Sequence, residues 1–389
     1  MSSEPIFNDL IGVMAVITMI PVFFIWLEKK TKWKVFNILP AIIWIFLTPI
    51  FLSNLNVIPK SSGIYTTFRS FAVPMFIVLM LLDINIKQAI RVAWRGAGVL
   101  VFGAVGIVAG AVLSYYIFKS GLPPDTWRGY GALAGSWIGG TGNLAAVADA
   151  IDTPGEMVGM VVLVDNFVYV LYFPIILTCK RWAAGFNRFT GVTQEQMAHI
   201  AEASAQVEKK THELHYRDVL VLLGFGFVTI FAANQLATLV PTLPPVLTES
   251  TWAILLVTTF GIVLSATPLK DIPGTEPLSM TFVYLYMTTM GAQADLSNIG
   301  GAQWFLVAGV VCILVHFGFI TIGARLFRVD VSMAATASVA AVGGAASAPV
   351  AAGFHREELV PISIMLALLG YGLGNYLGVA TAYLCHLLT

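Results

Sequence analysis

Long apolar stretches without a single charged residue occupy most of this chain. The longest run over residues 219–248, 296–324 and 359–389. A helix needs about 20 apolar residues to cross the roughly 30 Å hydrocarbon core of a bilayer. Several stretches reach that length alone, and others reach it once a flanking aspartate is included. The sequence therefore predicts an all-α polytopic membrane protein embedded in a lipid bilayer.

Composition excludes several other classes of protein. Hydrophobic residues make up 58% of the chain and charged residues only 11%, whereas a soluble domain carries about 25% charged residues. The 21 basic and 21 acidic side chains balance, so we expect no basic surface and no nucleic-acid partner. The three cysteines show neither a disulfide framework nor metal-ligand spacing. No protease or hydrolase motif is present, so we expect no enzyme activity.

A charged segment, residues 180–217, divides the chain into two similar halves. It carries 10 of the 42 charged side chains. Thr193 and Gln196 have capping-box spacing, which predicts an amphipathic helix at the membrane surface. Each half has a Gly-Gly pair among small residues, an acidic step about 15 residues later, and then a long apolar stretch. We predict two repeats, residues 1–179 and 218–389, joined by a cytoplasmic linker, residues 180–217.

The distribution of basic residues decides how the two halves are oriented. If the two Gly-Gly segments enter the membrane and return on the same side, each half has five spans. Seventeen of the 21 Lys and Arg residues then lie on one side, as the positive-inside rule requires. If those segments cross instead, the basic linker lies outside. We therefore predict inverted repeats, each of about five transmembrane helices plus a re-entrant Gly-rich segment, in a bacterial inner (plasma) membrane.

Inverted repeats with Gly-rich broken segments at matching positions are typical of secondary transporters. Non-helical backbone is tolerated at membrane depth only where it is buried in protein or lines a cavity. Half-helix N-termini at Gly139-Gly140 and Gly343-Gly344 offer partial positive charge to an anion. Carbonyl oxygens and the side chains of Ser136, Thr141, Asn143 and Ser347 are groups of the type that binds sodium, and we expect them to supply its ligands. The alternative is that the small residues only allow close helix packing.

Asp165 is the most informative single residue. It lies nine residues after Glu156 and fifteen before Lys180, which places it roughly 13 Å into the bilayer. An ionisable group at that depth is a functional-site hypothesis by default, although a structural carboxylate satisfied by a neighbouring helix is the alternative. Asn166 follows it directly. Asn375 lies in the corresponding span of the second half, either as a polar ligand or as a helix–helix contact.

The turn Gly139-Gly140-Thr141-Gly142-Asn143, with its partner in the second half, resembles the superfamily of cation:proton antiporters and anion transporters. It is similar to sodium:glutamate symporters in particular, although the second vertex lacks the third glycine. The Asp165-Asn166 pair resembles the acidic or amide pair of sodium/proton antiporters. As a whole the chain looks like an uncharacterised membrane family, the YjcL-like proteins. The resemblance implies a core domain that moves against a scaffold domain, often in homodimers.

We therefore expect a secondary active transporter that moves a small organic anion, coupled to sodium or protons, by alternating access. Asp165 would be the coupling carboxylate, and a sodium ion, the sole cofactor expected, would use Asp165, Thr141 and Asn143. The alternative is a cation/proton antiporter that uses Asp165 alone. The predicted substrate- or ion-binding residues are Ser136, Gly139, Gly140, Thr141, Asn143, Asp165, Asn166, Gly343, Gly344, Ser347 and Asn375.

Overall fold

The computed structural model of the protein describes residues 4–33, 35–36, 40–84, 86–197, 214–294 and 302–389. Its first half contains α1 (Leu10–Thr31), α3 (Ala41–Asn54), α4 (Gly63–Leu82), α5 (Ile86–Phe118), α6 (Thr126–Ala150), α7 (Gly155–Thr178) and α8 (Ala183–Thr190). Its second half contains α10 (Tyr216–Ala237), α11 (Glu249–Leu264), α12 (Thr275–Gln293), α13 (Ala302–Phe327), α14 (Val331–Val342), α15 (Gly344–His355) and α16 (Val360–His386). No strand occurs in these described ranges.

The helices form because an apolar chain in lipid must satisfy its backbone hydrogen bonds within each segment. Polar caps mark several starts. The Asp9 carboxylate accepts from the backbone N–H groups of Ile11 and Gly12 at 3.0 Å, and the Ser62 hydroxyl accepts from Ile64 N–H. Such caps satisfy donors that have no partner in the first turn. These polar positions therefore set where the apolar stretches become helices.

Seven helical segments of the described chain are long and apolar enough to cross a membrane. They lie at residues 10–31, 63–82, 92–121, 155–190, 216–237, 303–327 and 357–386. Shorter apolar helices of 10–17 residues are α3, α11 and α14. The prediction of an all-α polytopic membrane protein is confirmed. The division into residues 1–179, 180–217 and 218–389 stays a prediction.

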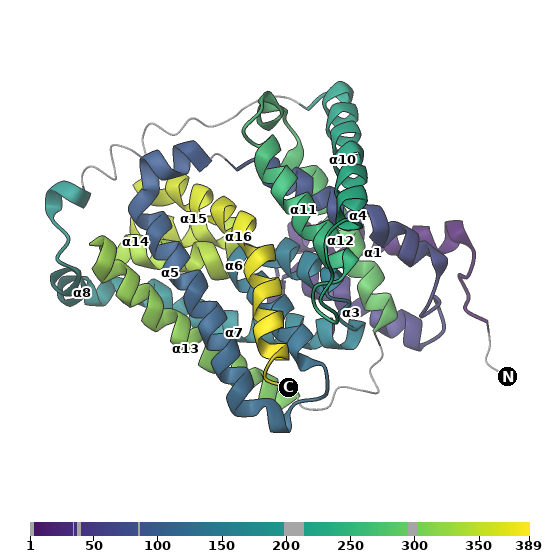
Figure 1. Cartoon of the computed structure of the whole chain (residues 1–389), viewed down its shortest axis with the longest axis horizontal. Coiled ribbons are helices and arrows are strands. Elements are labelled where there is room, and N and C mark those ends of the chain that lie inside the picture. The colour runs from purple at the N-terminus through teal and green to yellow at the C-terminus, as the bar shows by residue number, and fades with distance from the viewer. Residues whose placement is uncertain (1–3, 34, 37–39, 85, 198–213, 295–301) are drawn as a thin grey trace.

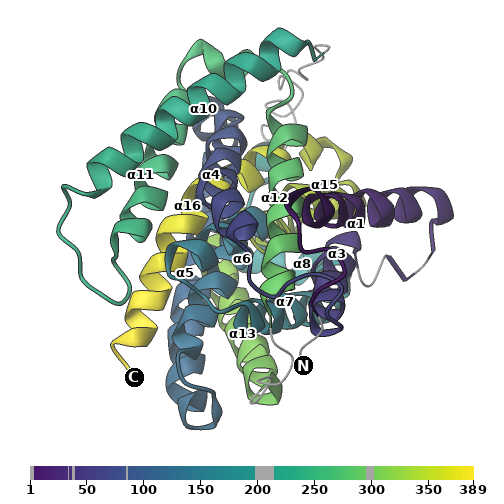
Figure 2. The ribbon, with the colours of Figure 1, turned by 90° about the vertical axis from the view of Figure 1, so that its right-hand side faces the viewer.

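The centre of the molecule is built from α5, α6, α7, α13 and α16. Helices α5 and α13 lie side by side, as Figures 1 and 2 show. A Cβ added at Gly110 would meet the Cys312 carbonyl oxygen at 2.7 Å, so glycines of α5 allow the two backbones to approach closely. Helices α1 and α10 lie toward the outside of the bundle in the same views. One of these central helices, α6, contains the first Gly-Gly segment.

Helix α6, here called hairpin 1, folds back on itself. Gly140 breaks it with φ 77° and ψ −173°. A Cβ added at Gly135 would lie only 3.0 Å from the Asn143 carbonyl oxygen, whereas eight residues of continuous helix rise about 12 Å. At the base of the hairpin, the Arg128 guanidinium donates to the Ile151 carbonyl oxygen. Both ends of hairpin 1 therefore lie at the same end of the bundle.

Helices α14 and α15, here called hairpin 2, also fold back on themselves. They meet at Gly343 and Gly344, and Gly344 has φ 60°. The ends of hairpin 2 are joined by an ion pair between Arg356 Nη1 and Asp330 Oδ2 at 3.3 Å. A continuous helix over the 24 residues of α14 and α15 would separate its ends by about 36 Å. This segment also enters and leaves at one end of the bundle.

The two hairpins enter from opposite ends and meet tip to tip. The base of hairpin 1 lies beside the first residue of α7, Gly155, only five residues along the chain. The base of hairpin 2 lies at the other end of α7, where Lys180 Nζ donates to the His355 carbonyl oxygen at 2.9 Å. A Cβ added at Gly344 would lie 3.7 Å from the Gly140 Cα. The broken backbone of both halves is therefore brought to one place inside the bundle.

The start of the predicted linker helix is described. The Thr193 hydroxyl accepts from Gln196 N–H at 3.2 Å, and the Gln196 side-chain oxygen accepts from Thr193 N–H at 3.1 Å. This is the reciprocal pattern of a capping box. The remainder of that helix, residues 198–213, lies outside the described residues, as does Asp295 of the second half.

Candidate functional site

The site is built around the meeting point of the two hairpin tips. Tyr371 of α16 lies against both of them. Its Cε1 would be 3.5 Å from a Cβ added at Gly140 and 3.7 Å from one added at Gly344. Its hydroxyl accepts from the backbone N–H of Ala345 at 3.3 Å. Positive φ angles at both tip glycines are conformations that other residues rarely adopt, so the sequence requires glycine there for backbone reasons.

Asn143, just past the tip of hairpin 1, is fully buried and joins hairpin 1 to α16. Its side-chain N–H group donates to the Tyr371 carbonyl oxygen and to Asn375 Oδ1, both at 2.9 Å. Asn375 in turn donates to the hydroxyl of Thr258 in α11 at 2.9 Å. Both partners are carbonyl-type oxygens, which can only accept hydrogen bonds. The amide of Asn143 is therefore oriented with its nitrogen toward them. The predicted residues Asn143 and Asn375 are therefore brought together.

The oxygen of the same amide has no hydrogen-bond partner among the described residues. Asn143 Oδ1 is buried, and it points toward Gly139, where an added Cβ would lie 2.3 Å from it. The Gly370 carbonyl oxygen would lie 2.9 Å from the same added Cβ. Buried acceptors are nearly always paired. An unpaired amide oxygen beside a carbonyl oxygen at a helix break is a ligand set suited to a hard cation such as sodium.

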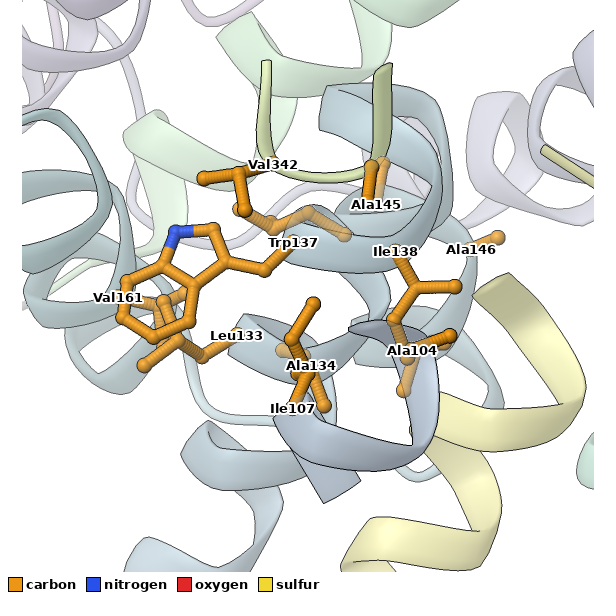
Figure 3. Close-up of a cluster of buried hydrophobic side chains, with 14 of the residues drawn as sticks. Ala104, Ile107, Leu133, Ala134, Trp137, Ile138, Ala145, Ala146, Val161 and Val342 are labelled. Atoms are coloured by element: carbon orange, nitrogen blue, oxygen red, sulfur yellow. The ribbon is translucent and has the colours of Figure 1, made fainter. Parts of the chain in front are cut away.

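Asp165 of α7 contacts the part of hairpin 1 that precedes its tip. Its carboxylate accepts from the Ser136 hydroxyl at 3.0 Å and from Trp137 Nε1 at 2.6 Å. Trp137 is fully buried in the apolar core, of which Figure 3 draws a part that includes Val161 of α7 and Val342 of α14. No basic side chain in the described part of the chain forms an ion pair with Asp165. Among the described residues, the carboxylate is thus held by two neutral donors and by no counter-charge.

Farther along α7, two tyrosines face hairpin 2. The Tyr169 hydroxyl lies 2.7 Å from where a Cβ on Gly343 would be, and it lies close to Ser347. Tyr172 forms a hydrogen bond with the Ser338 hydroxyl, and Ser338 contacts His316 Nε2 at 2.8 Å. One face of α7 therefore contacts hairpin 1 through Asp165 and hairpin 2 through the tyrosines.

His316 is held between two helices. Its Nδ1 lies 2.8 Å from the Gly103 carbonyl oxygen. A carbonyl oxygen only accepts, so Nδ1 carries a proton. Since the ring is fully buried and both nitrogens have partners, His316 is a satisfied core histidine.

For the other predicted residues, the structure shows fewer contacts that bear on a binding site. Thr141 at the tip of hairpin 1 and Ser347 in hairpin 2 are half-buried. Asn166 donates to the carbonyl oxygen of Val162 on its own helix at 2.8 Å and joins neither hairpin. Asp165 and Asn143 share no hydrogen-bond partner, although both were predicted for one sodium site.

The sequence interpretation missed three residues of the site. These are Trp137, Thr258 and Tyr371. Trp137 follows the predicted Ser136 directly, which is a local signal. Tyr371 lies between Gly370 and Gly372 in a Gly-rich helix, where a large polar side chain among glycines marks a close contact. For Thr258 no such signal exists, because it lies 117 residues before its partner Asn375.

An arginine side chain forms ion pairs at the base of hairpin 1. Arg69 of α4 forms ion pairs with Asp149 at the end of hairpin 1 and, at 2.7 Å, with Asp152. The Tyr286 hydroxyl of α12 also reaches Asp149, at 3.4 Å.

Within the described residues, no cluster of three or more His, Cys, Asp or Glu side chains is present that could hold a transition metal.

Comparison with known proteins places this chain in a family. Residues 15–388 match the family described as "Protein of unknown function (DUF819)". The chain is also 29% identical over 367 residues to the protein named "Uncharacterized membrane protein YjcL" of Bacillus subtilis (strain 168), covering 90% of this chain and 91% of that protein. The resemblance to YjcL-like membrane proteins is therefore confirmed. With nearly its whole length matched, this membrane protein belongs to the DUF819 family.

Proposed function

We propose that this protein is a secondary active transporter that moves a small organic anion, coupled to sodium or protons, by alternating access. One observation carries the proposal: two broken hairpins enter from opposite ends of the bundle and meet at Gly140 and Gly344. Such a pair offers backbone polar groups at membrane depth, reachable in principle from either side. The second helices of the two hairpins begin at the tips, and their N-termini favour an anion.

Neutral oxygen ligands near Asn143 support the sodium part of the proposal. The first helix of hairpin 1 ends at the tip, so its last carbonyl groups lack helical partners. Together with the unpaired Asn143 Oδ1, they provide oxygens without a formal charge. A sodium ion bound there would place positive charge beside the proposed anion. This favours binding of the two together, which is the physical basis of symport.

Asp165 supports the proton part of the proposal. A carboxylate without a basic partner inside a membrane protein is costly in its ionised form. Binding either a proton or a cation relieves that cost, and the two compete for one group. This same observation favours a second candidate, a cation/proton antiporter in which Asp165 exchanges protons for a cation and no organic solute is moved.

A thermal-shift experiment separates these candidates. Purified protein is heated with a panel of organic acids, with and without sodium, at several pH values. The symport proposal expects an acid that raises the melting temperature more in the presence of sodium. That acid should then accumulate in proteoliposomes under a sodium or proton gradient. A sodium response that no acid changes, with sodium-driven proton movement in the same vesicles, would favour the antiporter.

The proposal also covers the superfamily, the membrane and the oligomeric state of the protein. It includes membership in the superfamily of cation:proton antiporters and anion transporters, residence in a bacterial plasma membrane, and a homodimer in which hairpins move against a scaffold. It assigns no enzyme activity, no cofactor besides sodium, and no nucleic-acid partner.

A further inference from the structure

A cavity of about 230 Å³ lies between hairpin 2, the end of α7 and α13. It lies at the end of the bundle that the basic residues predict to be cytoplasmic. Most of its walls are aliphatic or aromatic, and Trp182, Phe186 and Phe317 contribute rings. Ser338, Thr321 and Cys179 are its only lining residues with a hydroxyl or thiol group, and the lining surface is almost entirely apolar. Ser338 lies five residues before Gly343, about 7.5 Å along α14 from the tip.

The matching position beside hairpin 1 is tightly packed. A Cβ added at Gly131 would lie 2.7 Å from the Ala382 Cβ of α16. One added at Gly378 would lie 3.0 Å from the Gly131 carbonyl oxygen and 3.2 Å from the Gly135 Cα. Backbones at these separations leave no room between hairpin 1 and α16. The two hairpins therefore differ, since hairpin 1 packs tightly against α16 and hairpin 2 borders a cavity.

Ser338 lines the cavity, but its hydroxyl group is already hydrogen-bonded to two other side chains. Since His316 Nδ1 donates to the Gly103 carbonyl oxygen, the neutral ring accepts at Nε2, and Ser338 donates to it. Tyr172 then donates to the Ser338 oxygen. This directional chain leaves Ser338 no proton to offer a ligand. A solute in the cavity therefore meets a surface that can satisfy few polar groups.

We infer that this cavity is the cytoplasmic vestibule of the site at the hairpin tips, and that the cargo is an organic anion with an apolar body. The inference rests on the proposed transport function. Apolar walls can bury the aliphatic or aromatic part of a solute at no cost in hydrogen bonds. A hydroxyl group or a second carboxylate would instead lose its hydrogen bonds to water and find no partner in the cavity. Arg181 and Arg188 are exposed beside Trp182 and Phe186, and their charge would attract anions to the opening.

The rate at which the native Cys179 thiol is modified tests the vestibule, and this measurement does not require the cargo to be identified. Cys179 lines the cavity, and replacing Cys312 and Cys385 by Ala leaves it as the sole thiol. The reagent is sulfonatoethyl methanethiosulfonate, a small anion, applied to inside-out vesicles. We expect Cys179 to be modified, and Ala335→Phe, which fills the cavity, to slow the reaction roughly tenfold. The matched control Ala184→Phe lies on exposed α8 and should leave the rate unchanged.

Two results would overturn the vestibule. One is modification of Cys179 by neutral N-ethylmaleimide but not by the charged reagent, which would show that the cavity opens to lipid. The other is an equal rate in folded Ala335→Phe protein. If Ala335→Phe does not fold, protection of Cys179 by solutes in the otherwise native cavity decides the matter.

Protection of Cys179 also tests the class of cargo. Benzoate and hexanoate should slow its modification, whereas malate and tartrate should not. Equal protection by malate would overturn the apolar cargo. If benzoate protects but does not accumulate in proteoliposomes under a sodium or proton gradient, the proposed transport function fails while the vestibule and its ligand class stand.

Discussion

Removing the Arg69 side-chain charge should destabilise the protein by leaving a buried carboxylate without its partner. In the native protein, Arg69 bonds to the Asp149 carboxylate, to the Asp149 carbonyl oxygen at 3.0 Å and to Asp152. Arg69→Met keeps the apolar stem but leaves the Asp149 carboxylate, among the described residues, with the Tyr286 hydroxyl at 3.4 Å as its hydrogen-bond partner. Breaking one partner of a buried ion pair costs about 3–5 kcal/mol.

The cost here should be smaller because the pair is only partly buried. The Arg69 side chain is 32% exposed, although that of Asp149 is only 12% exposed. We therefore expect about 2–3 kcal/mol, and a melting temperature lower by about 2–4 °C in detergent. Adding Asp149→Asn removes the unpaired charge, so the double variant should recover at least half of the loss.

Thermal denaturation followed by size-exclusion chromatography measures these shifts. Arg188→Met, which removes an exposed charge from α8, is the matched control and should change the melting temperature little. If Arg69→Met melts like the native protein, or if the double variant is as unstable as the single one, the ion pair does not hold hairpin 1 against α4.

Three further predictions concern the site and its orientation. Asp165→Asn should leave folded protein whose sodium-induced stabilisation no longer varies with pH, and an unchanged pH response in a thermal-shift titration would make Asp165 structural. Gly140→Val and Gly344→Val should abolish gradient-driven uptake, because positive φ costs a β-branched residue about 1–3 kcal/mol, whereas Gly224→Val, which has open space, should transport normally. Cysteines replacing Ala184 and Thr389 in a cysteine-free chain should react with an impermeant maleimide from opposite membrane faces, and reaction from one face would contradict the predicted topology.

The sequence carries the features that depend on local composition. Apolar length predicts the helices, and glycine pairs among small residues predict where the backbone breaks. The positive φ of Gly140 and Gly344 agrees with that expectation, because only glycine adopts such angles readily. The depth of Asp165 follows from counting residues along one helix. These properties each need no knowledge of a distant segment.

The partners of the site residues could not be predicted in the same way. Asn143 contacts Asn375 across 232 positions, and Arg69 contacts Asp149 across 80. Successive residues of a helix point about 100° apart, so the face that meets a distant helix depends on packing angles which a single sequence does not encode. For that reason Asp165 and Asn143 were predicted to share one ion, whereas in the fold they share no hydrogen-bond partner.

Access to the hairpin tips from both sides of the membrane is the most direct test of the proposed function. Thr141 is half-buried at the tip of hairpin 1, and Thr141→Cys in a cysteine-free chain provides a single reporter. A small charged methanethiosulfonate is applied to right-side-out and to inside-out vesicles. Alternating access predicts modification from both faces, with sodium or a stabilising organic acid shifting the ratio of the two rates. Modification from one face alone, with a rate that neither sodium, pH nor any such acid alters, would contradict the proposal.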